Sequence, residues 1–139
     1  AIEILKEYFP KKRIIDLDLK KNDKIPYEGI LHLDCTFNPV GKDKCIIYKN
    51  GFVDQNDYEL IIDIFGEENC FHVTDEEMFE MNPNIFSISP EVVVSDETFT
   101  RMNDFLRNEW GFTVEEIPYR EISKMGGLLR CSTMPLVRE

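Results

Sequence analysis

Residues 85–117, IFSISPEVVVSDETFTRMNDFLRNEWGFTVEEI, indicate the fold class most directly. The two short apolar runs at 85–88 and 92–94 predict strands. Between 96 and 110, apolar side chains recur at the spacing of an amphipathic helix, and a glycine follows that could end it. The run at 112–117 predicts another strand. This stretch therefore predicts an α/β unit of strand, strand, helix and strand.

The same order of elements is predicted once more, upstream. Strands are expected at 29–37 and 44–48, with a hairpin turn between them, and a further strand at 70–73. The helix between them is expected at 55–65, with Asp54 as its N-cap and Gly66 as its stop. Two repeats of roughly 50 residues each are therefore predicted, close to known repeat lengths. Paired strands before each helix argue against a doubly wound sheet.

The segments around these repeats give less regular signals. A helix is expected at 2–8, closed by Pro10, and a strand with one wet face at 13–19. A capping box at 74–77 predicts a short helix, and a helical turn is expected near 119–125. Because Ala1 falls within a helical pattern and the repeats are too few to close a ring, we expect the chain to be one portion of a longer polypeptide.

The composition limits the classes of function. The 139 residues suit one domain spanning 1–139, and a net charge of −11 argues against nucleic acid as the partner. Its apolar stretches are too short to cross a bilayer, so no membrane partner is expected. The four cysteines form no CxxC pair and only two histidines are present, so we predict no metal site and a reducing, cytoplasmic location.

A first candidate site lies at His32-Leu33-Asp34. If this segment is a strand, as expected, His32 and Asp34 point to the same face because side chains alternate along a strand. An imidazole beside a carboxylate suits acid–base chemistry and the binding of a cation. By itself the pattern is found more often in a structural hydrogen-bonded pair than in a site.

A second candidate site lies near the other end of the chain, where Gly126-Gly127 precedes Cys131. A double glycine lets the backbone bend closely past a ligand, and Arg130 would favour the thiolate form of the cysteine. The alternative is a buried cysteine that starts a final strand. Taken together, His32 and Cys131 could meet in space and give a cysteine nucleophile, an acid–base histidine and an orienting carboxylate, Asp34.

This combination of motifs resembles the guanidino-group-modifying superfamily, which includes arginine deiminases, dimethylarginine dimethylaminohydrolases and amidinotransferases. The resemblance implies the pentein fold, an α/β propeller of five repeats, of which this chain would be the C-terminal part of the catalytic domain. Cys131 and His32 would then be catalytic and Asp34 would bind substrate. The Glu-Gly-Gly-Asp-like segment of the earlier repeats does not occur in this sequence.

The resemblance also implies a reaction. The expected activity is hydrolysis of a guanidino C–N bond through a covalent cysteine thiouronium, on a small-molecule guanidine substrate and with no cofactor. Arginine deiminases place an arginine before the double glycine, where this chain has Met125, and the spacing to Cys131 is closer to that of amidinotransferases. Amidino transfer by the same site and a non-catalytic pentein-fold binding module stay open as alternatives. A homodimer, or association with the missing N-terminal repeats, is expected.

Overall fold

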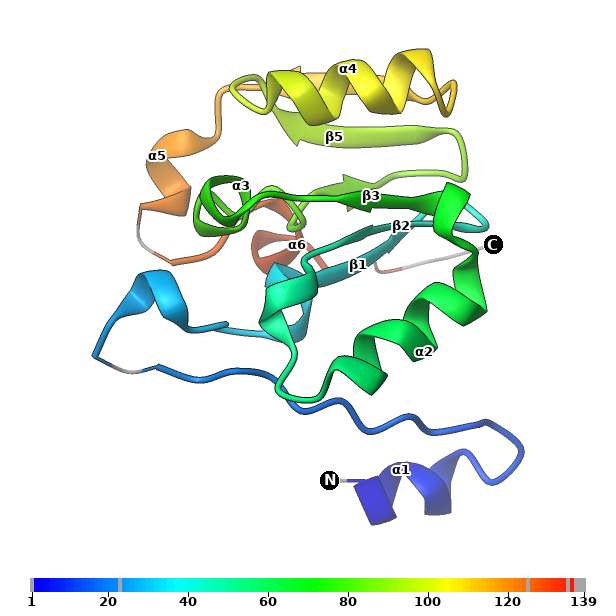
Figure 1. Cartoon of the computed structure of the whole chain (residues 1–139). Helices are drawn as coiled ribbons and strands as arrows, with labels where there is room; N and C mark the ends of the chain where they lie inside the picture. The colour runs from blue at the N-terminus through cyan, green and yellow to red at the C-terminus, as the bar shows by residue number, and fades with distance from the viewer. Residues whose placement is uncertain (1, 23, 125, 135, 137–139) are drawn as a thin grey trace.

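The computed structural model describes residues 2–22, 24–124, 126–134 and 136, which form two three-stranded sheets with helices packed on them (Figure 1). The strand orders are β1-β2-β3 and β4-β5-β6. In each sheet the first two strands pair antiparallel and the last two pair parallel. A helix connects the two parallel strands in both cases. The predicted repeat of strand, strand, helix and strand is therefore confirmed.

The bounds of the elements follow chain order. The first repeat consists of β1 (Phe37–Val40), β2 (Lys44–Ile47), α2 (Gln55–Phe65) and β3 (Cys70–His72). The second consists of β4 (Phe86–Ser87), β5 (Val92–Asp96), α4 (Thr100–Asn108) and β6 (Thr113–Ile117). The remaining helices are α1 (Ile2–Tyr8), α3 (Asp75–Phe79), α5 (Arg120–Ser123) and α6 (Leu129–Ser132). Short 3-10 turns are η1 (Pro26–Glu28), η2 (Leu33–Cys35), η3 (Lys49–Gly51) and η4 (Glu67–Asn69).

The core is divided between the two faces of β2. Cys45 and Ile47 pack under α2 with Tyr58 and Ile61, whereas Ile46 faces a larger cluster that reaches into the second sheet. This division follows from the alternation of side chains along a strand. Because Cys45, Ile46 and Ile47 are fully buried, β2 is covered on both sides. That explains why its sequence is a continuous apolar run.

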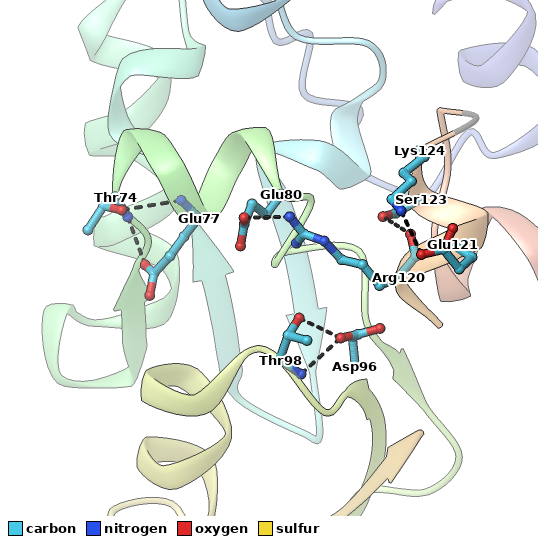
Figure 2. Close-up of polar contacts among 9 residues, drawn as sticks. All are labelled: Thr74, Glu77, Glu80, Asp96, Thr98, Arg120, Glu121, Ser123 and Lys124. Atoms are coloured by element: carbon cyan, nitrogen blue, oxygen red, sulfur yellow. Dashed lines mark hydrogen bonds and ion pairs between the residues drawn. The ribbon is translucent and has the colours of Figure 1, made fainter. Parts of the chain in front are cut away.

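Local signals at two helix starts are also confirmed. Asp54 caps α2 by accepting a hydrogen bond from the amide of Asn56 at 2.9 Å, and Gly66, with φ of 83°, follows the last turn. Thr74 and Glu77 form the reciprocal capping box of α3 (Figure 2). Each side chain satisfies a backbone N–H that the helix itself leaves free.

The helix expected at 96–110 is shorter than predicted, because β5 extends through Asp96 and α4 begins only at Thr100. The Asp96 carboxylate accepts hydrogen bonds from the backbone and hydroxyl of Thr98, at 2.9 and 2.6 Å (Figure 2). It also accepts one from the amide of Tyr119 at 2.8 Å. Asp96 therefore joins β5 to the start of α5 and does not cap α4.

The strand expected at 13–19 is wrong. The strand-type pairing found in this segment is an isolated bridge between Leu19 and Phe52, and the backbone amide of Asp18 donates to the Asp57 carboxylate at 3.1 Å. Its apolar–charged alternation nevertheless predicts the facing of the side chains, since Leu17 and Leu19 pack against the cluster under α2 while Asp16 and Asp18 are exposed. Across the described part of the chain, no helix has the length and apolar character that crossing a bilayer requires.

Candidate active site

Three predicted site residues, His32, Asp34 and Cys131, lie together in the structure. One side-chain ligand atom from each, a ring nitrogen, a carboxylate oxygen and the sulfur, lies within 4.8 Å of the others. The Sγ of Cys131 is 3.7 Å from the Oδ2 of Asp34, across a sequence separation of 97 residues. His32 and Cys131 are exposed and Asp34 is half-buried, so the cluster opens to solvent.

The predicted strand at 29–37 is wrong at His32 and Asp34. Residues Leu33–Cys35 form the 3-10 turn η2, and β1 begins only at Phe37. Its hydrogen bonds are local, from the amide of Cys35 to the carbonyl of His32 and from Thr36 to Leu33, at 3.1 and 3.0 Å. These amides are therefore not available to a neighbouring strand. A tight turn, and not strand alternation, presents the histidine and the carboxylate to Cys131.

Cys131 lies in α6, a single helical turn, and not at the start of a strand. Leu128 and Leu129 before it are buried and anchor the turn in the larger core cluster. Gly127 has φ of 143°, and a Cβ at this position would come within 3.3 Å of the Cβ of Cys131. The glycine therefore lets the chain pass directly against the cysteine, at a backbone angle that side chains disfavour.

The hydroxyl groups after Cys131 have a local role. Ser132 donates to the carbonyl of Leu128 at 2.7 Å, and Thr133 donates to that of Leu129 at 2.8 Å. Both bonds return to the turn that carries the cysteine. They satisfy backbone carbonyls of α6 and brace its C-terminal end.

The four cysteines differ in their surroundings. Cys131 is exposed, whereas Cys35, Cys45 and Cys70 are buried. Burial raises the pKa of the Cys35 thiol to about 12, and the neighbouring Asp34 carboxylate adds to the rise. Burial also raises the pKa of Cys45 and of Cys70. Since the thiolate is the reactive form, these three side chains are poor nucleophiles at neutral pH.

Two hollows flank η2. The first, of about 450 Å³, is lined by His32, Leu33, Asp34, Phe37, Pro39 and Arg130. The second, of about 470 Å³, is mostly apolar, and Leu31 and Cys35 form part of its wall. Its charged lining residues are Lys124 and the ion pair of Arg120 with Glu80, whose nitrogen and oxygen lie 2.6 Å apart (Figure 2). This pair raises the pKa of Arg120 above its usual range. The sequence patterns did not indicate the second hollow.

One residue at the cluster was missed by sequence reasoning. Asn84 is fully buried, and its Nδ2 donates a hydrogen bond to the Sγ of Cys131 at 3.2 Å. It lies in an irregular segment before β4, where no periodicity or motif marks it. The other histidine, His72, has different partners: its ring lies 3.1 Å from Glu67 and 3.4 Å from the hydroxyl of Tyr58.

The fold is shared with solved structures of guanidino-modifying enzymes. The N-terminal domain of ArgZ, a cyanobacterial arginine dihydrolase solved with its product, superposes with a TM-score of 0.76 at 21% identity, over 93% of this chain and 44% of that one. SxtG, an amidinotransferase from Microseira wollei, gives 0.73 at 20% identity, over 99% of this chain and 38% of that one. The repeats described above are thus of the pentein type found in this class of proteins.

Sequence comparison identifies the family. The arginine deiminase family model matches residues 51–138, so the chain belongs to that family. An uncharacterized Bacillus subtilis protein, YkgA, is 30% identical over 138 residues, which is 99% of this chain and 44% of YkgA. The arginine deiminase of Latilactobacillus sakei is 39% identical over 67 residues, 48% of this chain and 16% of that enzyme. The chain spans less than half the length of these relatives. Met125, whose identity departs from the arginine deiminase pattern, lies outside the described residues.

Proposed function

We propose that this chain supplies the C-terminal repeats of a pentein propeller and carries the nucleophile of a guanidino-modifying hydrolase. The observation that supports the proposal is the approach of His32, Asp34 and Cys131 to within 4.8 Å in a member of the arginine deiminase family. Cys131 lies 97 residues from Asp34 in the chain, and the three side chains hold the functional groups that covalent attack on a guanidinium needs. A reducing, cytoplasmic setting would suit an exposed thiol.

The first step is capture and attack. Asp34 pairs with the cationic guanidinium and orients it, because a carboxylate and a guanidinium form strong charge-assisted hydrogen bonds. The thiolate of Cys131 attacks the central carbon and forms a C–S bond. His32 donates a proton to the departing nitrogen as the C–N bond breaks. The products of this step are ammonia or an amine and a thiouronium bound to Cys131.

The second step restores the enzyme. Neutral His32 accepts a proton from a water molecule, and the resulting hydroxide attacks the thiouronium carbon. The C–S bond then breaks, the sulfur leaves as a thiolate, the added hydroxyl loses its proton to solvent, and the product is a urea. The sequence of bonds made and broken draws only on side chains of the cluster and on water.

Because Asp34 lies so close to the sulfur, the positive charge of the substrate should assist the formation of the Cys131 thiolate. With no cation bound, a thiolate on Cys131 would lie about 4 Å from the negatively charged Asp34 carboxylate, whose Oδ2 is 3.7 Å from Sγ, and the two charges would repel each other. A guanidinium cation between them offsets this repulsion and adds its own attraction. The site is therefore suited to cationic substrates, and we expect neutral ureas to be poor ones.

Transfer of the amidino group is the second candidate, favoured by the spacing from Gly126-Gly127 to Cys131. It uses the same thiouronium, but an amine replaces water in the second step. The two reactions differ in their products. Incubation with a guanidine substrate alone gives a urea if the enzyme hydrolyses, and a new guanidine forms only when an amine acceptor is added if it transfers.

Turnover by the complete natural protein tests the proposal. Cys131→Ser should abolish formation of urea or transferred product from guanidine substrates, because a hydroxyl is a much weaker nucleophile than a thiolate. Cys70→Ser is the matched control, since Cys70 lies outside the cluster and a hydroxyl can also donate to the carbonyl of Gly66, 3.2 Å from its sulfur. A Cys131→Ser protein that retains wild-type turnover would refute the assignment of the nucleophile.

A further inference from the structure

The helical turn that carries Cys131 has no cap of its own. A helix leaves its first N–H groups without partners, and a polar N-cap side chain normally accepts from the second or third of them. In α6 these are the N–H groups of Arg130 and Cys131, and the N-cap residue is Leu128, which has no acceptor in its side chain. The acceptor must therefore come from elsewhere in the fold.

Asn84 supplies that acceptor from 46 residues earlier in the chain. Its Oδ1 accepts from the amide of Arg130 at 3.1 Å and from the amide of Cys131 at 3.3 Å. The backbone carbonyl of Asn84 also accepts from Arg130, at 3.3 Å. One side chain thus takes the place of an N-cap and holds the backbone of Cys131.

The opposite end of the same amide faces the sulfur. Nδ2 of Asn84 lies 3.2 Å from the Sγ of Cys131 and donates to it. The orientation of the amide is determined by its surroundings, because the reversed amide would direct its NH₂ group at two backbone N–H donors. The hydrogen bond to the sulfur therefore follows from the capping bonds.

Asn84 is itself held rigidly. Asn38, buried in β1, donates to the carbonyls on both sides of it, to Pro83 at 2.7 Å and to Ile85 at 2.9 Å. The backbone N–H of Asn84 donates to the carbonyl of Met81 at 2.9 Å. Met81 has φ of 68°, an angle uncommon for a side chain of its kind. Such a conformation persists where the surrounding contacts hold it, and it is often found near functional sites.

We propose that Asn84 is a positioning residue for Cys131: it caps the turn that carries the cysteine and donates a hydrogen bond that favours the thiolate. The inference deepens the proposed function, on which it rests, by naming what holds the nucleophile. The other polar groups facing the sulfur or adjoining it are Asp34 and His32 from the η2 segment, the thiol of Cys35, and Arg130 in α6. Of these, the Asp34 carboxylate repels a negative charge on the sulfur. The neutral N–H of Asn84 has the opposite effect, because it donates a hydrogen bond to the sulfur.

The experiment measures the rate at which iodoacetamide alkylates Cys131 as a function of pH, followed by mass spectrometry of the labelled peptide. Asn84→Asp keeps an oxygen to cap α6 but replaces the donor with a carboxylate. Asn84→Ala removes both functions. Asn103→Asp is the control, because Asn103 is equally buried but donates to Asp96 and Glu116, away from the cluster.

In Asn84→Asp the midpoint of the alkylation profile should move up by about one to two pH units, the size expected for a lost hydrogen bond to a charged group. The rate at pH 7 should then fall about tenfold or more, and Asn103→Asp should show the wild-type profile. Asn84→Ala should move the profile in the same direction, which keeps the test valid if the aspartate variant does not fold. Wild-type profiles in folded Asn84 variants would overturn the inference.

The two proposals fail separately. If Cys131→Ser abolishes turnover while the Asn84 variants keep the wild-type alkylation profile, Asn84 is not a positioning residue but Cys131 remains the nucleophile. If the alkylation profile moves as expected while Cys131→Ser retains turnover, the hydrogen bond is established and the proposed reaction is refuted.

Discussion

Replacement of Asp34 with asparagine should change the reactivity of Cys131 in opposite directions toward cationic and neutral reagents. The substitution keeps the shape of the side chain and removes its charge. That charge lies 3.7 Å from the sulfur and is half-buried, so it acts both on an incoming guanidinium and on the thiolate. A purely structural carboxylate would have neither effect.

The Asp34→Asn variant should bind a cationic substrate less tightly than the wild type does. A lost charge-assisted hydrogen bond costs about 1.5–3 kcal/mol, which corresponds to roughly 10- to 150-fold lower affinity for a guanidine substrate. The reaction of a neutral reagent should instead become faster. Two unit charges about 4 Å apart repel by about 1 kcal/mol in water-like surroundings, and removal of that repulsion should raise the alkylation rate roughly fivefold.

The assay compares 2-chloroacetamidine, which carries an amidinium, with iodoacetamide, which is neutral, at pH 7. Asp34→Asn should react more slowly with the first and faster with the second. Asp54→Asn is the control, because asparagine caps a helix as well as aspartate does and Asp54 lies at α2. If both reagents change by the same factor, or if the control behaves as Asp34→Asn does, the electrostatic reasoning is wrong.

Three further results are expected. Leu128→Ala should lower the free energy of unfolding by about 2–5 kcal/mol in urea titrations, because Leu128 is fully buried beneath α6. Gly127→Ala should cost about 1–3 kcal/mol in the same assay through its φ of 143°, and it should slow the alkylation of Cys131 because its Cβ would lie 3.3 Å from that residue. Stability should fall at high pH: burial raises the pKa of Cys35 from 9.0 to about 12, so its contribution is complete below pH 9 and is lost as the pH rises toward 12. Urea midpoints at pH 8 and pH 11 that agree in the wild type would contradict the last expectation.

The sequence predicts the repeats because their signals are local. The caps at Asp54 and Thr74 and the stop at Gly66 depend on neighbours a few residues away, and the periodicity of the helices and strands reports which faces are buried. These signals therefore predict the same local structure largely independently of the rest of the fold. The same argument explains why the facing of Leu17 and Leu19 was predicted correctly although their segment is not a strand.

The errors occur where one sequence pattern is compatible with more than one backbone conformation. The segment at Leu33–Cys35 has the composition of a strand, but its amides bond within the turn η2. The helix expected from residue 96 begins only at Thr100, because Asp96 belongs to β5 and its carboxylate accepts hydrogen bonds from Thr98 and Tyr119.

The candidate site was predicted in part for a similar reason. His32, Asp34 and Cys131 were proposed together because two motifs coincide in one chain, and the structure brings their side chains together. Asn84 has no such signal. Its importance comes from bonds to residues 46 and 47 positions away, and these exist only in the folded chain.

The two repeats share one apolar cluster, and this has a consequence for how activity is lost. Ile30 and Cys35, next to His32 and Asp34, belong to the same cluster as Leu128 and Leu129, which anchor Cys131. The cluster also includes residues of both sheets, so neither repeat can open without removing support from one half of the site. Inactivation by heat and loss of the fold should therefore be a single cooperative event. We expect no temperature range in which the molecule is folded but inactive.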